Sequence, residues 1–370
     1  MSVLGFPASA AARHFQDLSR IFRDFRRPVP LSFARMEIVS RTAPRPVGLM
    51  RVAGLTPLVA CLGRVGAPLT RLLQRVRLPA RLFDRPEALI PTCQAARFID
   101  EAASVEGFEN VALVAGQGTP LEALGVFGRL VRRARTLHEA LDTAIRNMPA
   151  FDSGSRWWLE RQGGRARLCH ELVDAIDGER RQAREYRSSL AMNLIGLAAG
   201  PSDDIQRREA TVSFPVSLLG RAVPPLSGQR THDDDIEAWE ASAPAADFPG
   251  SVLQVIETLS FAHQARIGLV ADAIGISVRA LQRRLAEAGA TFAGLIAHER
   301  FATAIGLLEE TDSTILDIAL NLGYSDHAHF TRAFRRWTGV PPREFRRMTQ
   351  SARRNALRQD SLPLGRAANG

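Results

Sequence analysis

The pattern of apolar and polar positions is most regular in the last quarter of the chain, where one two-helix pattern occurs twice. In each copy the first helix is apolar with a small residue at its centre, Ala271 or Ala319, and a glycine follows four residues later, Gly275 or Gly323. Alanine lets two helices cross closely, and glycine supplies the turn conformation that residues with a Cβ resist. The pattern therefore predicts two helix-turn-helix units within residues 266–347.

The second helix of each unit has one apolar side and one basic side. Leu281 and Leu285 define the apolar side in the first unit, and Phe330 and Phe334 define it in the second. Recognition helices of this type enter the major groove of DNA with their N-terminal residues over the base edges. Helical hairpins with glycine turns also occur in proteins that bind no nucleic acid, but two copies with arginine-rich second helices favour DNA binding.

The residues on the basic sides are the candidate DNA contacts. Because arginine can donate two hydrogen bonds to guanine and glutamine can pair with adenine, the candidates for base or groove contact are Arg279, Gln282, Arg283, His327, His329 and Arg332. Arg284, Arg335 and Arg336 are predicted to contact phosphates, which add affinity without sequence information. Ser277 and Ser325 are each predicted to cap the second helix of their unit by accepting a backbone N–H. A solvated basic face is the alternative for all of these side chains.

A helical pattern, Thr291–Glu309, separates the two units. A helix of about 19 residues is roughly 28 Å long. Successive major grooves on one face of DNA lie roughly 34 Å apart. We therefore expect this segment to be a stiff rod that lets both second helices address one face of a duplex.

Three stretches of this region resemble the AraC/XylS family of transcriptional regulators: SVRALQRRLAEAG, ERFATAIGLL and ILDIALNLGYSDHAHFTRAFRRWTGVPPREFR. The resemblance implies that both units touch DNA, through the positions named above, and that one domain can occupy a site without dimerising. It also implies contact with RNA polymerase, because activation of transcription is the commoner behaviour in the family.

The rest of the chain mixes helical and strand-like patterns. Apolar periodicity predicts helices at Pro91–Ser104, Leu121–Ala134, Leu137–Asn147 (capped by Thr136) and Glu179–Ala199. Alternation predicts strands at Arg156–Arg161, Arg165–Val173 and Ala210–Phe214, with a hairpin turn at Gly163-Gly164. Gly116-Gln117-Gly118 is predicted to be a turn, and one of Trp157 and Trp158 is predicted to point inward, as core or as pocket wall. The fold class is α+β, mostly α, with an N-terminal mixed α/β sensor domain and an all-α C-terminal domain.

The stretch VALVAGQGTPLEALGVFGRLVRRARTLHEALDTAIRNM is similar to the sensor domain of a subgroup of this family, which has an arabinose-binding-like N-terminal domain. The resemblance implies a small-molecule effector such as an amino acid, a sugar or a related metabolite, and it leaves a homodimer open. The stretch between Gly200 and the strand at Ala210–Phe214 is shorter than the subgroup pattern. The alternative is therefore a ligand-independent regulator whose N-terminal domain only dimerises.

Composition divides the chain into five parts. They are an Arg-rich extension expected to be flexible (1–45), a ligand-sensing or dimerisation domain (46–222), a linker rich in proline and acidic residues (223–250), a DNA-binding domain with both helix-turn-helix units (251–348) and a flexible tail (349–370).

The net charge of +9 comes from 48 arginines without any lysine, yet residues 251–348 are nearly neutral, with eleven arginines and ten acidic residues. DNA binding therefore requires that these arginines gather on one face. Cys61, Cys93 and Cys169 are far apart in sequence, so we predict no metal site, no cofactor and no disulfide framework. No run approaches the roughly 20 apolar residues that a membrane span needs.

These patterns predict a bacterial regulator of the cytoplasm, associated with the nucleoid, and not an enzyme. It would bind double-stranded DNA sequence-specifically, activate transcription and respond to a metabolite. The alternative from another class is an alkyl-transfer enzyme tethered to DNA, which would use Cys93 because this thiol follows Pro91 at a predicted helix start.

Overall fold

The computed structural model describes residues 43–360 except 106, 118, 174–180, 201, 225–232 and 261–264. The chain divides into two compact units. The larger unit comprises Thr42–Thr258 and Arg266–Gly289, and the described part of the smaller unit lies mainly from Ala290 onward. The five-part division drawn from the sequence stays a prediction.

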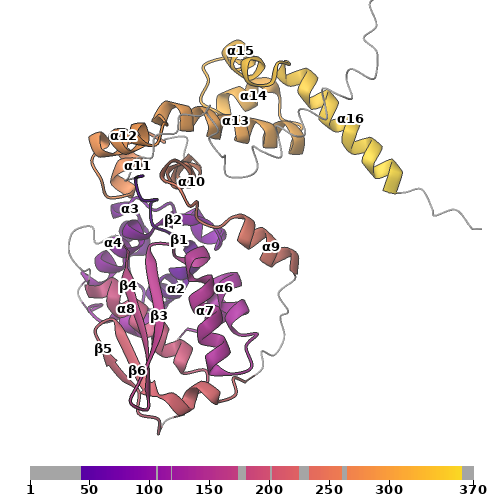
Figure 1. The fold of residues 1–370 in the computed structure, drawn as a ribbon. Helices are drawn as coiled ribbons and strands as arrows, with labels where there is room; N and C mark the ends of the chain where they lie inside the picture. Colours follow the sequence, from indigo (N-terminus) through magenta and orange to yellow (C-terminus); the bar gives the residue numbers. More distant parts are fainter. Residues whose placement is uncertain are drawn as a thin grey trace, which may run out of the picture. The chain divides into compact units, whose positions relative to one another are not determined.

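A four-stranded antiparallel sheet forms one layer of the larger unit (Figure 1). In spatial order its strands are β3 (Ser155–Gln162), β4 (Arg165–Leu172), β6 (Thr211–Pro215) and β5 (Gln206–Arg208). Gly163 and Gly164 join β3 to β4 with φ values of 57° and 78°, which is the combination that a tight hairpin turn with matching twist requires. The three predicted strands and the turn are confirmed. Strand β5 was not predicted, because its three residues are polar and exposed and no apolar alternation marks it.

Helices α7 (Leu137–Phe151) and α8 (Arg181–Ile195) pack against this sheet. The Thr136 hydroxyl accepts the backbone N–H of Glu139 at 3.2 Å, which confirms the predicted cap of α7. The helix predicted at Leu121–Ala134 is instead a 3-10 turn, η3 (Leu121–Leu124), followed by α6 (Gly125–Val131). Gly125 has a φ of 68°, and this left-handed conformation breaks the helix.

A second core lies under the two-stranded sheet of β1 (Leu49–Arg51) and β2 (Leu89–Pro91). The helices of this region are α2 (Thr56–Arg64), α3 (Leu69–Arg75), α4 (Thr92–Ala103) and α5 (Val111–Gln117), with 3-10 turns η1 (Val52–Gly54) and η2 (Ala80–Asp84). Another 3-10 turn, η4 (Val216–Gly220), follows β6. Gly116 and Gln117 belong to α5, so the predicted turn there is wrong. Gly116 is needed because a Cβ at this position would collide with Ser189 in α8.

A buried arginine fixes a helix within the segment predicted as linker. The helices that follow the sheet are α9 (Asp233–Ala241), α10 (Phe248–Ser260), α11 (Ile267–Ala273) and α12 (Val278–Glu287). Arg51 is fully buried and donates to the carbonyls of Ala150, Glu87 and Trp239 at 2.9, 2.9 and 2.6 Å. Its guanidinium carbon lies 4.7 Å from the centroid of the Trp239 ring. Burial lowers the pKa of Arg51 to about 10, which still leaves it charged at neutral pH.

His170 on β4 is a second buried ionisable group. Its Nε2 lies 2.9 Å from the Ser188 hydroxyl in α8, and its ring centroid lies 5.2 Å from that of Trp157. Burial, helped by the charges of Arg187 and Arg184, lowers the pKa of His170 to about 3. The imidazole is therefore neutral in the folded protein at neutral pH.

The smaller unit is helical in its described part. It contains α13 (Phe292–Glu310), α14 (Ile315–Asn321), α15 (His327–Thr338) and α16 (Pro342–Asp360). Residues on one side of each helix form a shared core: Phe301, Ala304, Leu308, Ile318, Ala319, Leu322, Phe330, Phe334 and Phe345. The predicted rod is confirmed as the single helix α13, and α16 continues through 349–360, the first part of the predicted tail.

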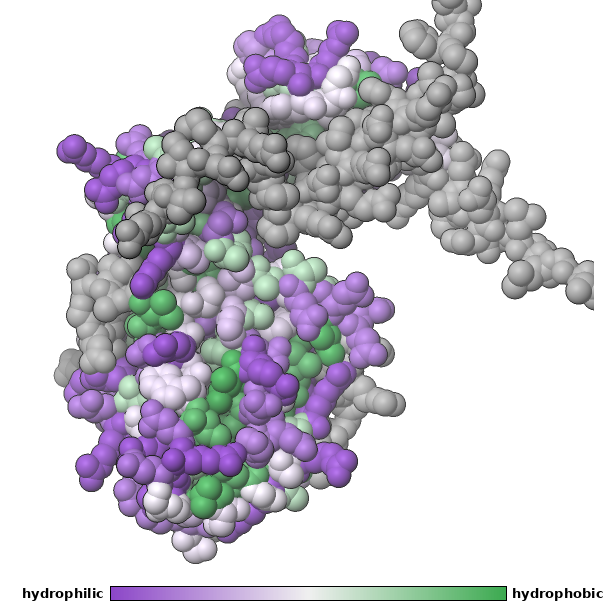
Figure 2. All heavy atoms as spheres, in the orientation of Figure 1, coloured by the Kyte–Doolittle hydropathy of each residue, from purple (hydrophilic) through white to green (hydrophobic). Residues whose placement is uncertain are grey.

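Hydrophilic residues dominate the visible face of the larger unit, with smaller hydrophobic areas between them (Figure 2). Among the described residues, every helix is too short or too polar to cross a lipid bilayer.

Replacing Arg51 with methionine should lower the free energy of unfolding by about 3 kcal/mol, because three buried carbonyls would lose a charged donor. Urea unfolding of the full chain measures the change. The control is Arg75→Met, since Arg75 makes an ion pair with Glu101 that is half exposed. Equal effects of the two substitutions would contradict the anchoring role of Arg51.

Replacing His170 with glutamine should flatten the pH dependence of stability below neutral pH. An unfolded histidine protonates near about pH 6.5, whereas the folded imidazole resists protonation until about pH 3. The unfolded state therefore binds more protons in this window, and the native chain should lose up to ~1.4 kcal/mol per pH unit as the pH falls through it. Urea unfolding at pH 7 and at pH 5 tests this, and equal losses in the variant and the native chain would refute it.

Candidate nucleic-acid interface and ligand cavity

Helices α11 and α12 form the first helix-turn-helix unit. Gly275 has a φ of 75°, in the left-handed region, and the N–H of Ile276 donates to the Ala271 carbonyl at 3.0 Å to close α11. The Ser277 hydroxyl accepts the backbone N–H of Ala280 at 3.1 Å. The glycine turn and the serine cap predicted for this unit are confirmed.

The two sides of α12 differ as the sequence pattern predicts. Leu281 and Leu285 are 0% and 1% exposed. Arg279, Gln282 and Arg283 are all exposed. The three side chains predicted to contact bases are therefore presented to solvent together, and their contact with DNA stays a prediction.

Two arginines of α12 have contacts within the protein. Arg283 Nε lies 3.6 Å from the Glu287 carboxylate in an exposed ion pair of the kind that water and salt weaken. Arg284 is half-buried, with its guanidinium carbon 5.9 Å from the ring centroid of Phe248 in α10. A phosphate contact by Arg284 would therefore compete with its packing on Phe248. Arg283 would give up only its weak ion pair with Glu287 to contact DNA.

Helices α14 and α15 form the second unit. Gly323 has a φ of 76°, and the N–H of Tyr324 donates to the Ala319 carbonyl at 2.9 Å. At the start of α14, Thr314 and Asp317 each accept the other's backbone N–H. The turn of the second unit thus repeats that of the first, as predicted.

The cap of α15 lies one residue later than predicted. The Asp326 carboxylate accepts the backbone N–H of His329 at 2.8 Å, and this bond is the main cause that lowers the pKa of Asp326. The Ser325 hydroxyl instead donates to the Asp326 carboxylate at 3.2 Å. The prediction of Ser325 as the cap is wrong because α15 begins at His327, which places the carboxylate of Asp326 in the N-cap position.

The polar side of α15 is presented in the same way as that of α12. Phe330 and Phe334 are fully buried, with ring centroids 5.6 Å apart. The exposed polar residues of α15 are His327, His329, Arg332, Arg335 and Arg336. His329 Nδ1 lies 2.9 Å from the Asp326 carboxylate, so this ring is oriented before any DNA arrives. Contact of these five residues with bases or phosphates stays a prediction.

Within the larger unit, helix α4 contacts the first helix-turn-helix unit. Arg97 Nη1 donates to the Asp272 carbonyl at 2.7 Å, and the Cys93 thiol donates to the Ala273 carbonyl at 3.0 Å. The Asp272 carboxylate lies 3.7 Å from Arg97 and 3.5 Å from Arg77. These contacts attach the C-terminal end of α11 to α4. Cys93, the thiol considered for alkyl transfer, takes part in this attachment.

A different side of α4 lines a cavity. The residues of α4 on this side follow helical spacing: Thr92, Ala95, Ala96 and Ile99. The remaining wall comes from β1, η1, η3, α6, α7, β3 and α8. Helix α4 therefore lies between the cavity and the first helix-turn-helix unit.

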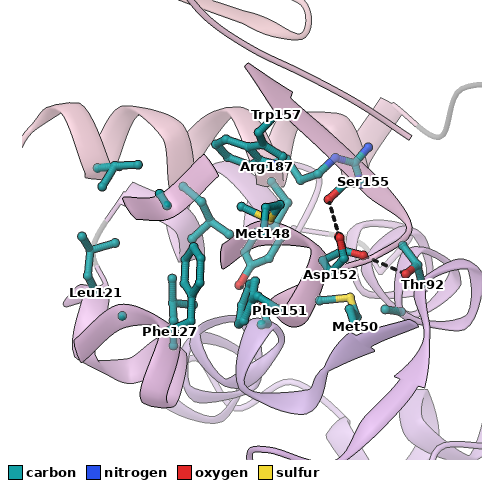
Figure 3. A pocket seen from close by; sticks show the side chains of 18 of the residues that line it. Met50, Thr92, Leu121, Phe127, Met148, Phe151, Asp152, Ser155, Trp157 and Arg187 are labelled. Carbon is teal, nitrogen blue, oxygen red and sulfur yellow. Dashed lines mark hydrogen bonds between the residues drawn. The ribbon is translucent and has the colours of Figure 1, made fainter. Parts of the chain in front are cut away.

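The charged groups of the cavity lie at one end (Figure 3). Asp152 is buried there and accepts hydrogen bonds from the Thr92 hydroxyl at 2.8 Å and from the Ser155 hydroxyl at 2.7 Å. Arg187 lines the same end, and Leu121 and Phe127 lie at the other. Burial raises the pKa of Asp152 above its usual value, and the hydroxyls and Arg187 oppose that shift.

Trp157 is the inward-facing member of the tryptophan pair and lines the cavity. It is 8% exposed, and its indole Nε1 has no hydrogen-bond partner among the described residues. Trp158 is half-buried and donates to Glu160 at 2.8 Å. The alternation of the strand predicted one inward indole. Other wall residues, such as Asp152 in the loop before β3 and Arg187 on α8, were missed because their convergence depends on how separate elements pack.

Comparison with known proteins finds two matching domain families. Residues 270–348 match a helix-turn-helix domain, and residues 66–216 match the N-terminal arabinose-binding domain of AraC transcription regulators. The HTH-type transcriptional regulator VirS of Mycobacterium tuberculosis is 24% identical over 327 residues, which cover 80% of this chain and 96% of that protein. The Ornithine utilization regulator of Pseudomonas aeruginosa matches with the same identity and the same coverage.

Other matches are shorter or weaker. An uncharacterized HTH-type transcriptional regulator of Mycobacterium tuberculosis is 38% identical over 78 residues, and the match covers 21% of this chain but only 23% of that protein. Among solved structures, the transcriptional regulator CdpR from Pseudomonas aeruginosa aligns with a TM-score of 0.32 and 20% identity, covering 80% of this chain and 98% of that one. With an arabinose-binding-like domain followed by a helix-turn-helix domain, the chain belongs to the AraC family of transcriptional regulators.

Proposed function

We propose that this chain is a sequence-specific DNA-binding regulator, acting as an activator, whose larger unit responds to a small molecule. One observation carries the DNA-binding part of the proposal. Both second helices bury their apolar side and expose the side that carries the predicted contacts, Arg279 and Arg283 in α12 and Arg332 in α15. Guanidinium groups on the exposed side of such helices suit guanine edges and phosphates.

RNA polymerase is the proposed partner of the DNA-bound chain, in the cytoplasm and at the nucleoid. A homodimer is compatible with this function but is not required, because one chain carries two helix-turn-helix units. A ligand-independent regulator is the second candidate. The cavity beside α4 favours the ligand-responsive form over it.

The cavity supports a route for regulation. Helix α4 lines the cavity with Ala95 and Ile99 and holds α11 with Cys93 and Arg97. A ligand that shifts α4 would change the contact with Asp272 and with it the position of α12. Closely packed elements transmit such shifts because there is little free volume to absorb them.

Replacing Arg279, Arg283 or Arg332 with alanine should reduce binding to the DNA upstream of the chain's own gene. Each loss should be about 1–3 kcal/mol where the arginine contacts a base, and the preference for that base should relax. Gel shifts with the native site and with point-mutated sites measure both effects. Arg343→Ala is the control, because Arg343 is exposed on α16 outside the predicted contacts. Unchanged affinity and preference in all three variants would refute the proposal.

Replacing Asp272 with alanine should loosen the first helix-turn-helix unit without unfolding the larger unit. The Asp272 side chain is half exposed, so its pairs with Arg77 and Arg97 are weak, and amide hydrogen exchange in α11 and α12 should rise about two- to fivefold. Exchange in α14 and α15 is the internal control. If α11 and α12 exchange at the native rate, the Asp272 carboxylate does not hold the unit.

A further inference from the structure

The cavity beside α4 has a wall that does not suit a sugar. A sugar carries hydroxyl groups along its whole length, and each buried hydroxyl needs a hydrogen-bond partner. The charged side chains, Asp152 and Arg187, lie at one end only, and the wall at the other end comes from Leu121, Leu124, Phe127 and Val131. The hydroxyl of Tyr186, which also lines the cavity, already donates to the Gly54 carbonyl at 2.8 Å. Despite the arabinose-binding name of the matching domain family, the wall fits a molecule with an apolar body and one polar head.

The carboxylate at the polar end is already engaged by the protein. Asp152 accepts from the hydroxyls of Thr92 and Ser155 and from the backbone N–H of Gly154 at 3.1 Å. A carboxylate has about four acceptor positions, so three internal donors leave little capacity for a ligand ammonium. A cationic head is therefore disfavoured.

Two donors at the cavity suit an acceptor-rich head. The indole N–H of Trp157 is buried and has no hydrogen-bond partner among the described residues, although it can only donate. Arg187 is the one basic side chain among the described residues that line the cavity. A carboxylate head could accept from the Trp157 indole and would be attracted by the positive charge of Arg187, which also acts on Asp152.

The cavity volume sets the size of the apolar body. The cavity has a volume of about 50 Å³, and one water needs roughly 10–15 Å³ on that scale. Only a compact group fits, with some adaptation from Met50 and Met148, whose unbranched side chains repack easily.

We propose that this cavity binds a compact apolar carboxylate, with the carboxylate toward Trp157 and Arg187 and the hydrocarbon body toward Leu121 and Phe127. The proposal deepens the ligand-responsive part of the proposed function and rests on it only for the consequence of binding. The binding itself can be measured without DNA.

Calorimetry and thermal unfolding of the full chain with four probes test the proposal. The probes are isovalerate, its neutral isostere isovaleramide, the cation isoamylamine and L-arabinose. We expect saturable binding and a rise in Tm with isovalerate, and at least tenfold weaker binding of the other three. Failure of isovalerate to bind, or equal or tighter binding of isovaleramide, isoamylamine or L-arabinose, would overturn the proposal.

Two matched pairs of variants locate the head group. Trp157→Phe should raise the Kd for isovalerate about tenfold, and Arg187→Gln about 10- to 100-fold. Trp158→Phe and Arg181→Gln are the controls, because Trp158 bonds Glu160 outside the cavity and Arg181 is exposed on the same helix as Arg187. Circular dichroism checks that each variant is folded. Native affinity in folded Trp157→Phe and Arg187→Gln would contradict the assignment.

A gel shift of the full chain with its upstream DNA, in the absence of the four small molecules, separates the ligand assignment from the proposed function. If isovalerate fails to bind while the chain still recognises its DNA, only the ligand assignment falls. If isovalerate binds but no DNA sequence is preferred, the ligand assignment stands and the regulatory function falls.

Discussion

Burial of one apolar side on each second helix is the constraint on which the functional account depends. Leu281 and Leu285 in α12, and Phe330 and Phe334 in α15, are almost fully excluded from water. A helix that buries these positions must turn its opposite side to solvent. The arginines and histidines there are therefore exposed as a consequence of packing, and no further device is needed to present them.

Helix α4 has two roles in the larger unit. One side of it forms the cavity wall, and another side holds the end of α11 through the Asp272 carbonyl and carboxylate. The buried Arg51 binds α9 to the same unit, so the segment after the sheet is also attached to it. The cavity and the first helix-turn-helix unit are thus connected within the larger unit by ordinary hydrogen bonds and packing.

Local patterns in the sequence predicted the local structure well. Helical spacing and the two glycines predicted both helix-turn-helix turns, and strand alternation with Gly163-Gly164 predicted the central hairpin. The misses need information from elsewhere in the chain. Gly116 is helical because it packs on Ser189, and α9 holds its place because Trp239 lies on Arg51, nearly 190 residues earlier. The cavity wall comes from many separate elements, so no single pattern reveals it.

The cap of α15 shows that a sequence pattern can leave the first residue of a helix uncertain by one position. Ser325 and Asp326 are adjacent acceptors of similar strength, and only the start of the helix at His327 decides between them.

The central claim, that both exposed faces read one side of a duplex, is tested most directly by hydroxyl-radical footprinting of the full chain on its own upstream DNA. We expect two protected patches about 10 base pairs apart on one face of the DNA. A single patch, or two patches on opposite faces, would contradict the account.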